Sequence, residues 1–203
     1  QNITSGAPVG ADGATYTDEN GGKWRYLRAN DALATSTVAF EKSVVSGTYY
    51  RGVGGNSSRS GSPFIHVNVS GATTRDGVTN GANDTAEPID ADEFYVHPGD
   101  PNSANHYVVL RFIVPEDGWY SAFVTAHDVN GGGTALNNKS GAEVRLLANN
   151  VLQAHGVVVL ENWIGATWSG GTQTKRFDFQ MPVRWMAAGE TIDFMVGANG
   201  EHN

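Results

Sequence analysis

The stretch of sequence that decides the fold spans residues 107–126 and reads YVVLRFIVPEDGWYSAFVTA. Apolar side chains alternate on both sides of a central turn: Val108, Leu110, Phe112 and Val114 precede it, and Tyr120, Ala122, Val124 and Ala126 follow it. Residues 115–118 (Pro-Glu-Asp-Gly) have turn chemistry, because proline pre-sets φ and glycine tolerates dihedrals that other residues avoid. We interpret the stretch as two strands of an antiparallel hairpin.

The same alternation, bounded by turn signals, recurs along most of the chain. It predicts strands at 24–28, 37–45, 48–52, 63–69, 94–97, 106–114, 119–127, 142–147, 151–160, 175–186 and 191–196. The last two are interpreted as a second antiparallel pair, because residues 187–190 (Ala-Ala-Gly-Glu) form a turn between them. Residues 70–92 and 128–141 are rich in glycine and polar residues and predict long loops. The predicted fold class is all-β, an antiparallel two-sheet β-sandwich of the jelly-roll type.

Composition and charge restrict the classes of function. The chain has 203 residues, a net charge of −8 and no cysteine, so disulfides and thiolate metal sites are excluded. Nucleic-acid binding needs a basic surface that this acidic sequence lacks, so we expect no nucleic-acid partner. No apolar run approaches the roughly 20 residues of a membrane-spanning helix, and we expect no membrane span.

Small and polar residues dominate the first part of the chain. We interpret residues 1–22 as a flexible N-terminal arm or linker and residues 23–203 as one β-sandwich domain. The opening residues, Gln-Asn-Ile-Thr-Ser-Gly, look like a mature N-terminus after cleavage of a signal peptide. We therefore expect a protein that is secreted, periplasmic or on the cell surface.

Several turn and core motifs in the second half of the chain share an order with a known group of domains. They are His97-Pro98-Gly99, residues 111–120, the glycine-rich loop at 130–133, Asn149-Asn150 and residues 188–200. In this order they resemble jelly-roll, carbohydrate-binding-module-like domains of secreted bacterial polysaccharide-degrading proteins, over about residues 90–200. The resemblance implies a non-catalytic domain that binds polysaccharide and tethers a covalently linked catalytic domain to it. It carries over no specific ligand residue.

Sugar recognition needs flat aromatic faces, together with amides and carboxylates for the hydroxyl groups. Trp163 and Trp168 are the leading candidates, because they lie in a loop-like stretch where an indole is harder to bury. The other candidate ligand residues follow a turn or border the glycine-rich loop: Tyr49, Tyr50, Arg51, His127, Asp128 and Asn130. Trp24, Trp119 and Trp185 lie within strand patterns, and we expect them to pack in the core.

A structural calcium ion is a candidate cofactor, because calcium is held by hard oxygen ligands from loops. Asp128, Asn130, Asn137 and Glu143 are the candidate ligands, although their spacing matches no EF-hand. The six histidines form no zinc-binding motif.

Two alternative functions stay open. Gln153-Ala154-His155 resembles the Gln-x-His strand motif of jelly-roll alginate lyases, in which the histidine works with a tyrosine, an arginine and the glutamine. This tripeptide keeps open a polysaccharide lyase or glycoside hydrolase, although no nucleophile elbow is present. The other alternative is a structural or adhesion module that binds a protein partner.

Overall fold

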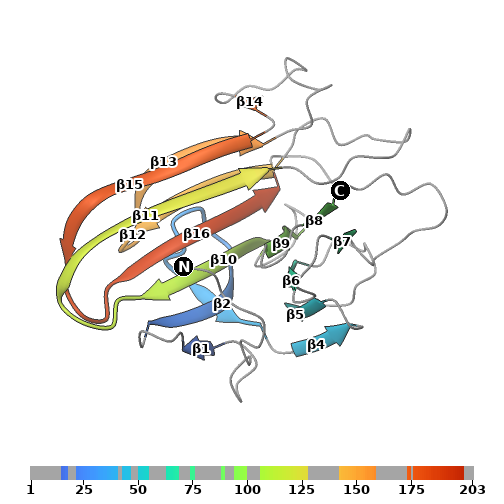
Figure 1. Cartoon of the computed structure of the whole chain (residues 1–203), viewed down its shortest axis with the longest axis horizontal. Coiled ribbons are helices and arrows are strands. Elements are labelled where there is room, and N and C mark those ends of the chain that lie inside the picture. The colour runs from blue at the N-terminus through green and yellow to red at the C-terminus, as the bar shows by residue number, and fades with distance from the viewer. Residues whose placement is uncertain are drawn as a thin grey trace.

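The computed structural model describes residues 15–17, 22–40, 43–46, 50–54, 63–68, 74–75, 88–89, 94–99, 106–127, 142–158, 173–174 and 176–198. Within these ranges all regular structure is β-strand, and the predicted all-β class is confirmed (Figure 1). The strand pairs run antiparallel except for one short parallel pair. Within the same ranges there is no helix of the length and apolarity that a membrane crossing requires.

The largest sheet holds eight strands. In spatial order they are β1 (Thr15–Thr17), β2 (Lys23–Ala29), β10 (Tyr107–Ile113), β16 (Thr191–Ala198), β12 (Ala142–Ala148), β13 (Val151–Val158) and β14 (Gln173–Thr174), with β3 (Thr37–Ala39) paired to β2. Residues 15–17 of the predicted arm thus pair with β2. The rest of the arm up to residue 21 lies outside the described residues, so the division of the chain into an arm and a domain stays a prediction.

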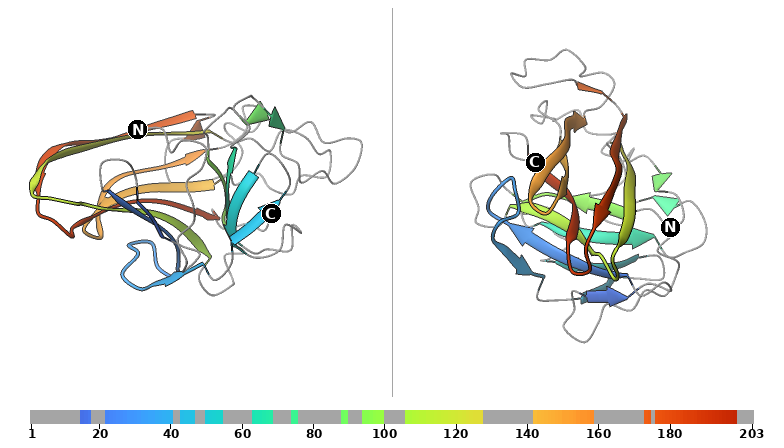
Figure 2. Two further views of the ribbon diagram at one scale, coloured as in Figure 1. Left: turned by 60° about the horizontal axis from the view of Figure 1, so that its bottom comes forward. Right: turned by 90° about the vertical axis from the view of Figure 1, so that its left-hand side faces the viewer.

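Three smaller sheets complete the described structure. The first is a two-stranded ribbon of β11 (Gly118–His127) and β15 (Arg176–Met186), which curves along the large sheet (Figures 1 and 2). The second has four strands, β4 (Ser43–Ser46), β5 (Tyr50–Gly54), β6 (Phe64–Asn68) and β9 (Phe94–His97). The third is the short pair β7 (Thr74–Arg75) and β8 (Pro88–Ile89), inside a segment predicted to be a loop.

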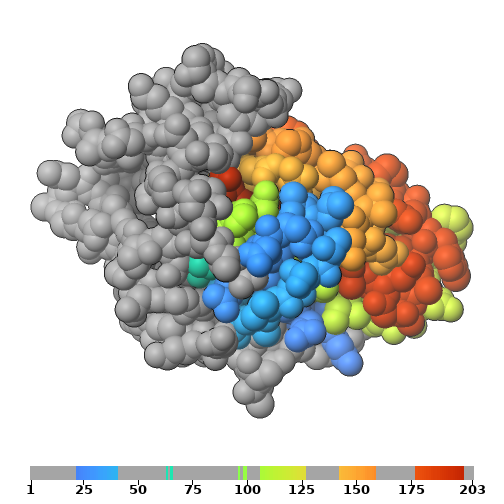
Figure 3. Space-filling model, turned by 180° about the vertical axis from the view of Figure 1, so that it is seen from behind, coloured from blue at the N-terminus to red at the C-terminus, as the bar shows by residue number. Residues whose placement is uncertain are grey.

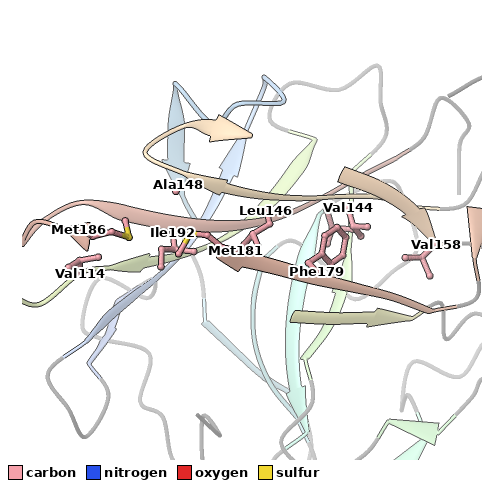
Figure 4. Close-up of a cluster of buried hydrophobic side chains, with 10 residues drawn as sticks. Val114, Val144, Leu146, Ala148, Val158, Phe179, Met181, Met186 and Ile192 are labelled. Atoms are coloured by element: carbon pink, nitrogen blue, oxygen red, sulfur yellow. The ribbon is translucent and has the colours of Figure 1, made fainter. Parts of the chain in front are cut away.

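The main core lies between the ribbon and the large sheet (Figure 4). Phe179, Met181 and Met186 of β15 are fully buried against apolar side chains from the large sheet. Those partners include Val144 and Leu146 of β12. A second cluster joins Ile65 of β6 to β2 and β10 through residues such as Tyr26 and Leu110. The ribbon and the four-stranded sheet therefore both cover the same side of the large sheet, which we call its front face.

The predicted hairpin over residues 107–126 is wrong in its pairing. β10 already pairs with β2 along one edge and with β16 along the other, so β11 has no edge of β10 to join. The turn instead carries the chain out of the large sheet and into the ribbon, where β11 pairs with β15. The predicted pairing of β15 with β16 fails for the same reason, because β16 lies between β10 and β12.

The two turns that cross between the layers are hydrogen-bonded to each other. The amide of Val114 donates to the carbonyl of Glu190 at 2.9 Å, and the amide of Gly189 donates to the carbonyl of Val114 at 2.8 Å. The amide of Ala188 donates to the Asp117 carboxylate at 2.8 Å. We call these five residues the clasp, because they fasten the ribbon to the end of the large sheet.

The segment between β2 and β3 covers the opposite side of the large sheet, its back face (Figure 3). Asp31 holds this segment in shape, because its carboxylate accepts hydrogen bonds from the amides of Leu33, Thr35 and Ser36. Burial raises the pKa of Asp31, but these backbone bonds outweigh burial and lower it overall. Ala34 of this segment packs in a buried cluster that includes residues of β2, β10, β12 and β16.

Candidate functional site

Large apolar side chains are exposed on the side of the ribbon that faces away from the core. Along β11, residues 120, 122, 124 and 126 contribute to the core, and the intervening residues point outward. We define the outer face as Trp119, Ser121, Phe123 and Thr125 of β11 with Asp178, Gln180, Val183 and Trp185 of β15. Trp119 is 70% exposed, Phe123 68%, Val183 66% and Trp185 54%. Exposed apolar side chains gathered on one face are typical of a binding surface, whereas scattered ones are not.

The two tryptophans form a cross-strand pair. Trp119 lies directly opposite Trp185, with ring centroids 5.8 Å apart and ring planes at 80°. This edge-to-face arrangement is a favoured geometry for aromatic pairs. Because the rings are nearly perpendicular, a flat ligand can stack on only one of them, and the other borders it.

The outer face becomes polar away from the tryptophans. Phe123 lies opposite Gln180, and Thr125 lies opposite Asp178. The Thr125 hydroxyl donates to the Asp178 carboxylate at 2.7 Å. Aromatic side chains at one end therefore give way to an amide, a hydroxyl and a carboxylate at the other, all on exposed positions of one ribbon.

A β-bulge turns Trp185 outward. The register shifts between Tyr120 and Ala122, where Pro182 and Val183 of β15 together oppose Ser121. Proline lacks an amide hydrogen and is tolerated at such an irregularity. Phe177, Phe179 and Met181 point inward before the bulge, and strict alternation would have carried Trp185 inward as well. The extra residue at the bulge reverses the inward–outward alternation, so Trp185 points outward.

The expectation that Trp119 and Trp185 pack in the core is therefore wrong, because both rings are more than half exposed. A signal for Trp119 was present in the sequence, since it alternates with the inward set that begins at Tyr120. Trp24 was predicted to pack and does so, with its ring 5.1 Å from that of Phe112.

Most of the predicted ligand residues lie beyond what the structure describes. Trp163, Trp168, Tyr49, Asp128, Asn130 and Asn137 lie outside the described residues. Tyr50 and Arg51 are the first two residues of β5, and His127 is the last residue of β11. For these three only the backbone is described, so their assignment to a glycan site stays a prediction.

A second group of polar side chains lies on the back face of the large sheet. Glu143 of β12 is its centre: it accepts a hydrogen bond from the Tyr107 hydroxyl at 2.9 Å and is bonded by the Arg145 guanidinium. His155 Nε2 lies 2.9 Å from a Glu143 oxygen. Gly197 separates Tyr107 from Glu143 in the sheet, and the Tyr107 ring occupies the space that a side chain at Gly197 would fill.

Tyr107 is held in its protonated form. Burial, together with the negative charge of Glu143 and the hydrogen bond donated to it, raises the pKa of Tyr107 to about 12. At neutral pH this hydroxyl is a donor to Glu143, and removing its proton is unfavourable. In this network the negative charge of Glu143 is balanced by the Arg145 guanidinium, and each polar or ionic side chain has a partner within the sheet.

A buried ion pair lies nearby on the same face. The Arg111 guanidinium makes two hydrogen bonds of 2.7 Å to the carboxylate of Asp193, and a longer one to the Ala34 carbonyl. Asp193 is fully buried. Burial raises its pKa, and the hydrogen bonds and charge of Arg111 offset only part of this rise. The pair ties β10 and β16 to the covering segment between β2 and β3.

The described part of the chain gives no support to a metal site. Among the described residues, no group of three or more histidine, aspartate or glutamate side chains is arranged to hold an ion. Glu143 is the one predicted calcium ligand whose side chain is described. Its carboxylate already contacts Tyr107, Arg145 and His155. Calcium binding by the remaining predicted ligands stays a prediction.

No family model matches this sequence. A search of curated proteins likewise finds no relative. Two groups of side chains are therefore what points to a function: the outer face of the ribbon and the network around Glu143.

Proposed function

We propose that this chain is a non-catalytic module that binds carbohydrate through the outer face of the ribbon. The observation that carries the proposal is the exposed cross-strand pair Trp119 and Trp185, with Phe123 exposed further along the same face. Aromatic rings are amphipathic surfaces on which the apolar side of a sugar ring can stack. Their exposure is otherwise costly, because burying a large side chain of this kind contributes about 1.5–3 kcal/mol.

The polar residues of the outer face suit the hydroxyl groups of a sugar. Gln180 can both donate and accept hydrogen bonds, and Asp178 is an acceptor paired with Thr125. The fully buried centre of a protein–protein interface is depleted of charged residues. The outer face instead changes from aromatic to polar along its length, which favours a glycan over a protein partner.

The proposal includes a finer view of the fold. The chain is a jelly-roll sandwich, in which the ribbon and the four-stranded sheet form the layer opposite the large sheet. This view is supported by the shared core between the layers and by the two turns that cross between them. A module of this kind belongs in a secreted, periplasmic or cell-surface protein and positions a linked catalytic domain on its polysaccharide.

Affinity electrophoresis of the whole chain in gels that contain soluble polysaccharides tests the proposal. We expect at least one polysaccharide to retard the wild-type protein, and Trp119→Ala or Trp185→Ala to weaken that retardation. Loss of one aromatic stack, about 0.5–1.5 kcal/mol beyond area burial, corresponds to roughly a two- to twelvefold loss of affinity. Leu152→Ala is the matched control, because Leu152 is 42% exposed but lies on β13, away from the outer face.

Two results would overturn the proposal. One is the absence of retardation by any member of a broad panel of plant, fungal and bacterial polysaccharides. The other is retardation that both tryptophan variants retain in full. A stable complex with a surface protein that free sugar does not dissociate would instead indicate the adhesion module.

The second candidate function is a polysaccharide lyase centred on His155. It is favoured by one observation, that Tyr107, Arg145 and His155 meet around Glu143 on one face of the sheet. Against it, Gln153 bonds to the carbonyl of Val151, and the raised pKa of Tyr107 makes this tyrosine a poor base. Unsaturated uronate products that form with the wild type and disappear in His155→Ala would establish the lyase.

A further inference from the structure

We infer that the ligand is an uncharged glycan chain several sugars long, which lies along the ribbon from the tryptophan pair to Asp178. The inference rests on the proposed function and names the class of carbohydrate that the same face would take.

The outer face is long compared with a single sugar ring. Trp119, Ser121, Phe123 and Thr125 are all exposed and occupy successive outward positions of β11. At about 3.3 Å per residue, Trp119 and Phe123 are roughly 13 Å apart along the strand, and Trp119 and Thr125 roughly 20 Å. A single sugar ring covers about one aromatic side chain and cannot reach both ends. Only an extended oligosaccharide contacts the tryptophans and the polar end together.

The outer face carries little charge of its own. Asp178 is the one ionisable side chain among the eight residues that define the outer face. The turns next to the tryptophans add Glu116, Asp117 and Glu190, and the whole chain carries a net charge of −8. Arg184 is the one cation of the ribbon among the described side chains, but it is half-buried and lies opposite Tyr120, which faces the core. Arg176 and His127 pair in backbone register beyond Thr125 and Asp178, at the end of the ribbon far from the tryptophans. Beside the tryptophans the field is therefore negative and disfavours a polyanion such as a polyuronate.

The chemical groups of the outer face follow a definite order along the ribbon. The perpendicular indoles suit one stacked sugar at the end of a chain, and Phe123 offers a second apolar contact further along. Beyond Phe123, Gln180, Thr125 and Asp178 offer hydrogen bonds to hydroxyl groups. Aromatic and polar contacts are thus two ends of one site, and each sugar added to a bound chain should gain contacts until the face is covered.

The test is calorimetric titration of the whole chain with oligosaccharides of defined length. The neutral series are β-glucan, xylan and mannan oligosaccharides, and the acidic series are oligogalacturonate and oligoalginate. We expect affinity for one neutral series to rise with length and then reach a plateau, and the acidic series to bind at least tenfold more weakly. Phe123→Ala and Asp178→Asn should each lower affinity about two- to tenfold for long oligosaccharides and leave the shortest ligands unaffected.

The control and the contrary outcomes separate this inference from the proposed function. Leu152→Ala should bind every oligosaccharide like the wild type, and equal unfolding midpoints show that the variants are folded. Affinity that does not depend on length, or tighter binding of the acidic series, overturns the inference while glycan binding through Trp119 still stands. Absence of binding to every series removes the proposed function itself.

Discussion

At the scale of single residues, Tyr107 links the polar network of the back face to the stability of the fold. Its hydroxyl bonds to Glu143, and its pKa rises from an ordinary 10.0 to about 12. Between these values the unfolded chain loses the proton while the folded chain keeps it. The stabilisation is therefore fully present below pH 10 and is lost as the pH rises through about 12.

Tyr107→Phe tests this coupling. The variant should lose about 0.5–1.5 kcal/mol of stability at neutral pH, because one hydrogen bond is removed. Its free energy of unfolding should then fall less steeply than that of the wild type between pH 10 and pH 12, measured by urea titration. Tyr120→Phe is the control, since the Tyr120 hydroxyl bonds to a backbone carbonyl and not to a carboxylate. Equal slopes in Tyr107→Phe and the wild type would count against the assignment.

At the scale of elements, a glycine sets how closely β13 approaches β15. A Cβ atom at Gly156 would lie 2.3 Å from the Phe177 ring, which is far too close for unbonded atoms. Gly156→Ala should therefore destabilise the protein by about 1–3 kcal/mol through overpacking. Phe177→Leu in the same chain should relieve the clash, so that the two substitutions are non-additive in chemical denaturation. Strict additivity would show that the two strands adjust without strain.

The strands themselves could largely be predicted from the sequence, because alternation reports directly on a half-buried sheet. Their partners could not. The turn at residues 115–118 fits a hairpin and a crossing between layers equally well, and the choice depends on β2 and β16 occupying both edges of β10. The same limit applied to the outer face. Strict alternation along β11 predicts that Trp119 points outward. It predicts the wrong direction for Trp185, because the bulge at Pro182 and Val183 reverses the inward–outward alternation of β15.

At the scale of the whole molecule, we expect the clasp to make the ribbon and the large sheet unfold as one cooperative unit. The ribbon supplies three of the ten buried residues of the main core, and the crossing turns at its end are bonded to each other. The outer face is thus carried on a packed support: its inward neighbours lie in the main core, and the turns beside the tryptophans are hydrogen-bonded to each other. A binding surface held in this way needs little ordering when a ligand arrives, which favours affinity.

Gly189→Ala tests the clasp, because Gly189 has a φ of +86° and nothing lies within 4 Å of where its Cβ would be. Gly189→Ala should therefore lower the free energy of unfolding by about 1–2 kcal/mol, through backbone conformation alone. Gly189→Asn should recover part of this loss, because asparagine tolerates positive φ better than alanine. Since both layers depend on the clasp, circular dichroism and tryptophan fluorescence should report one shared transition that moves to lower urea. An unshifted transition would mean that the clasp contributes little to stability. Fluorescence that changes before the circular dichroism does would mean that the ribbon opens independently of the large sheet.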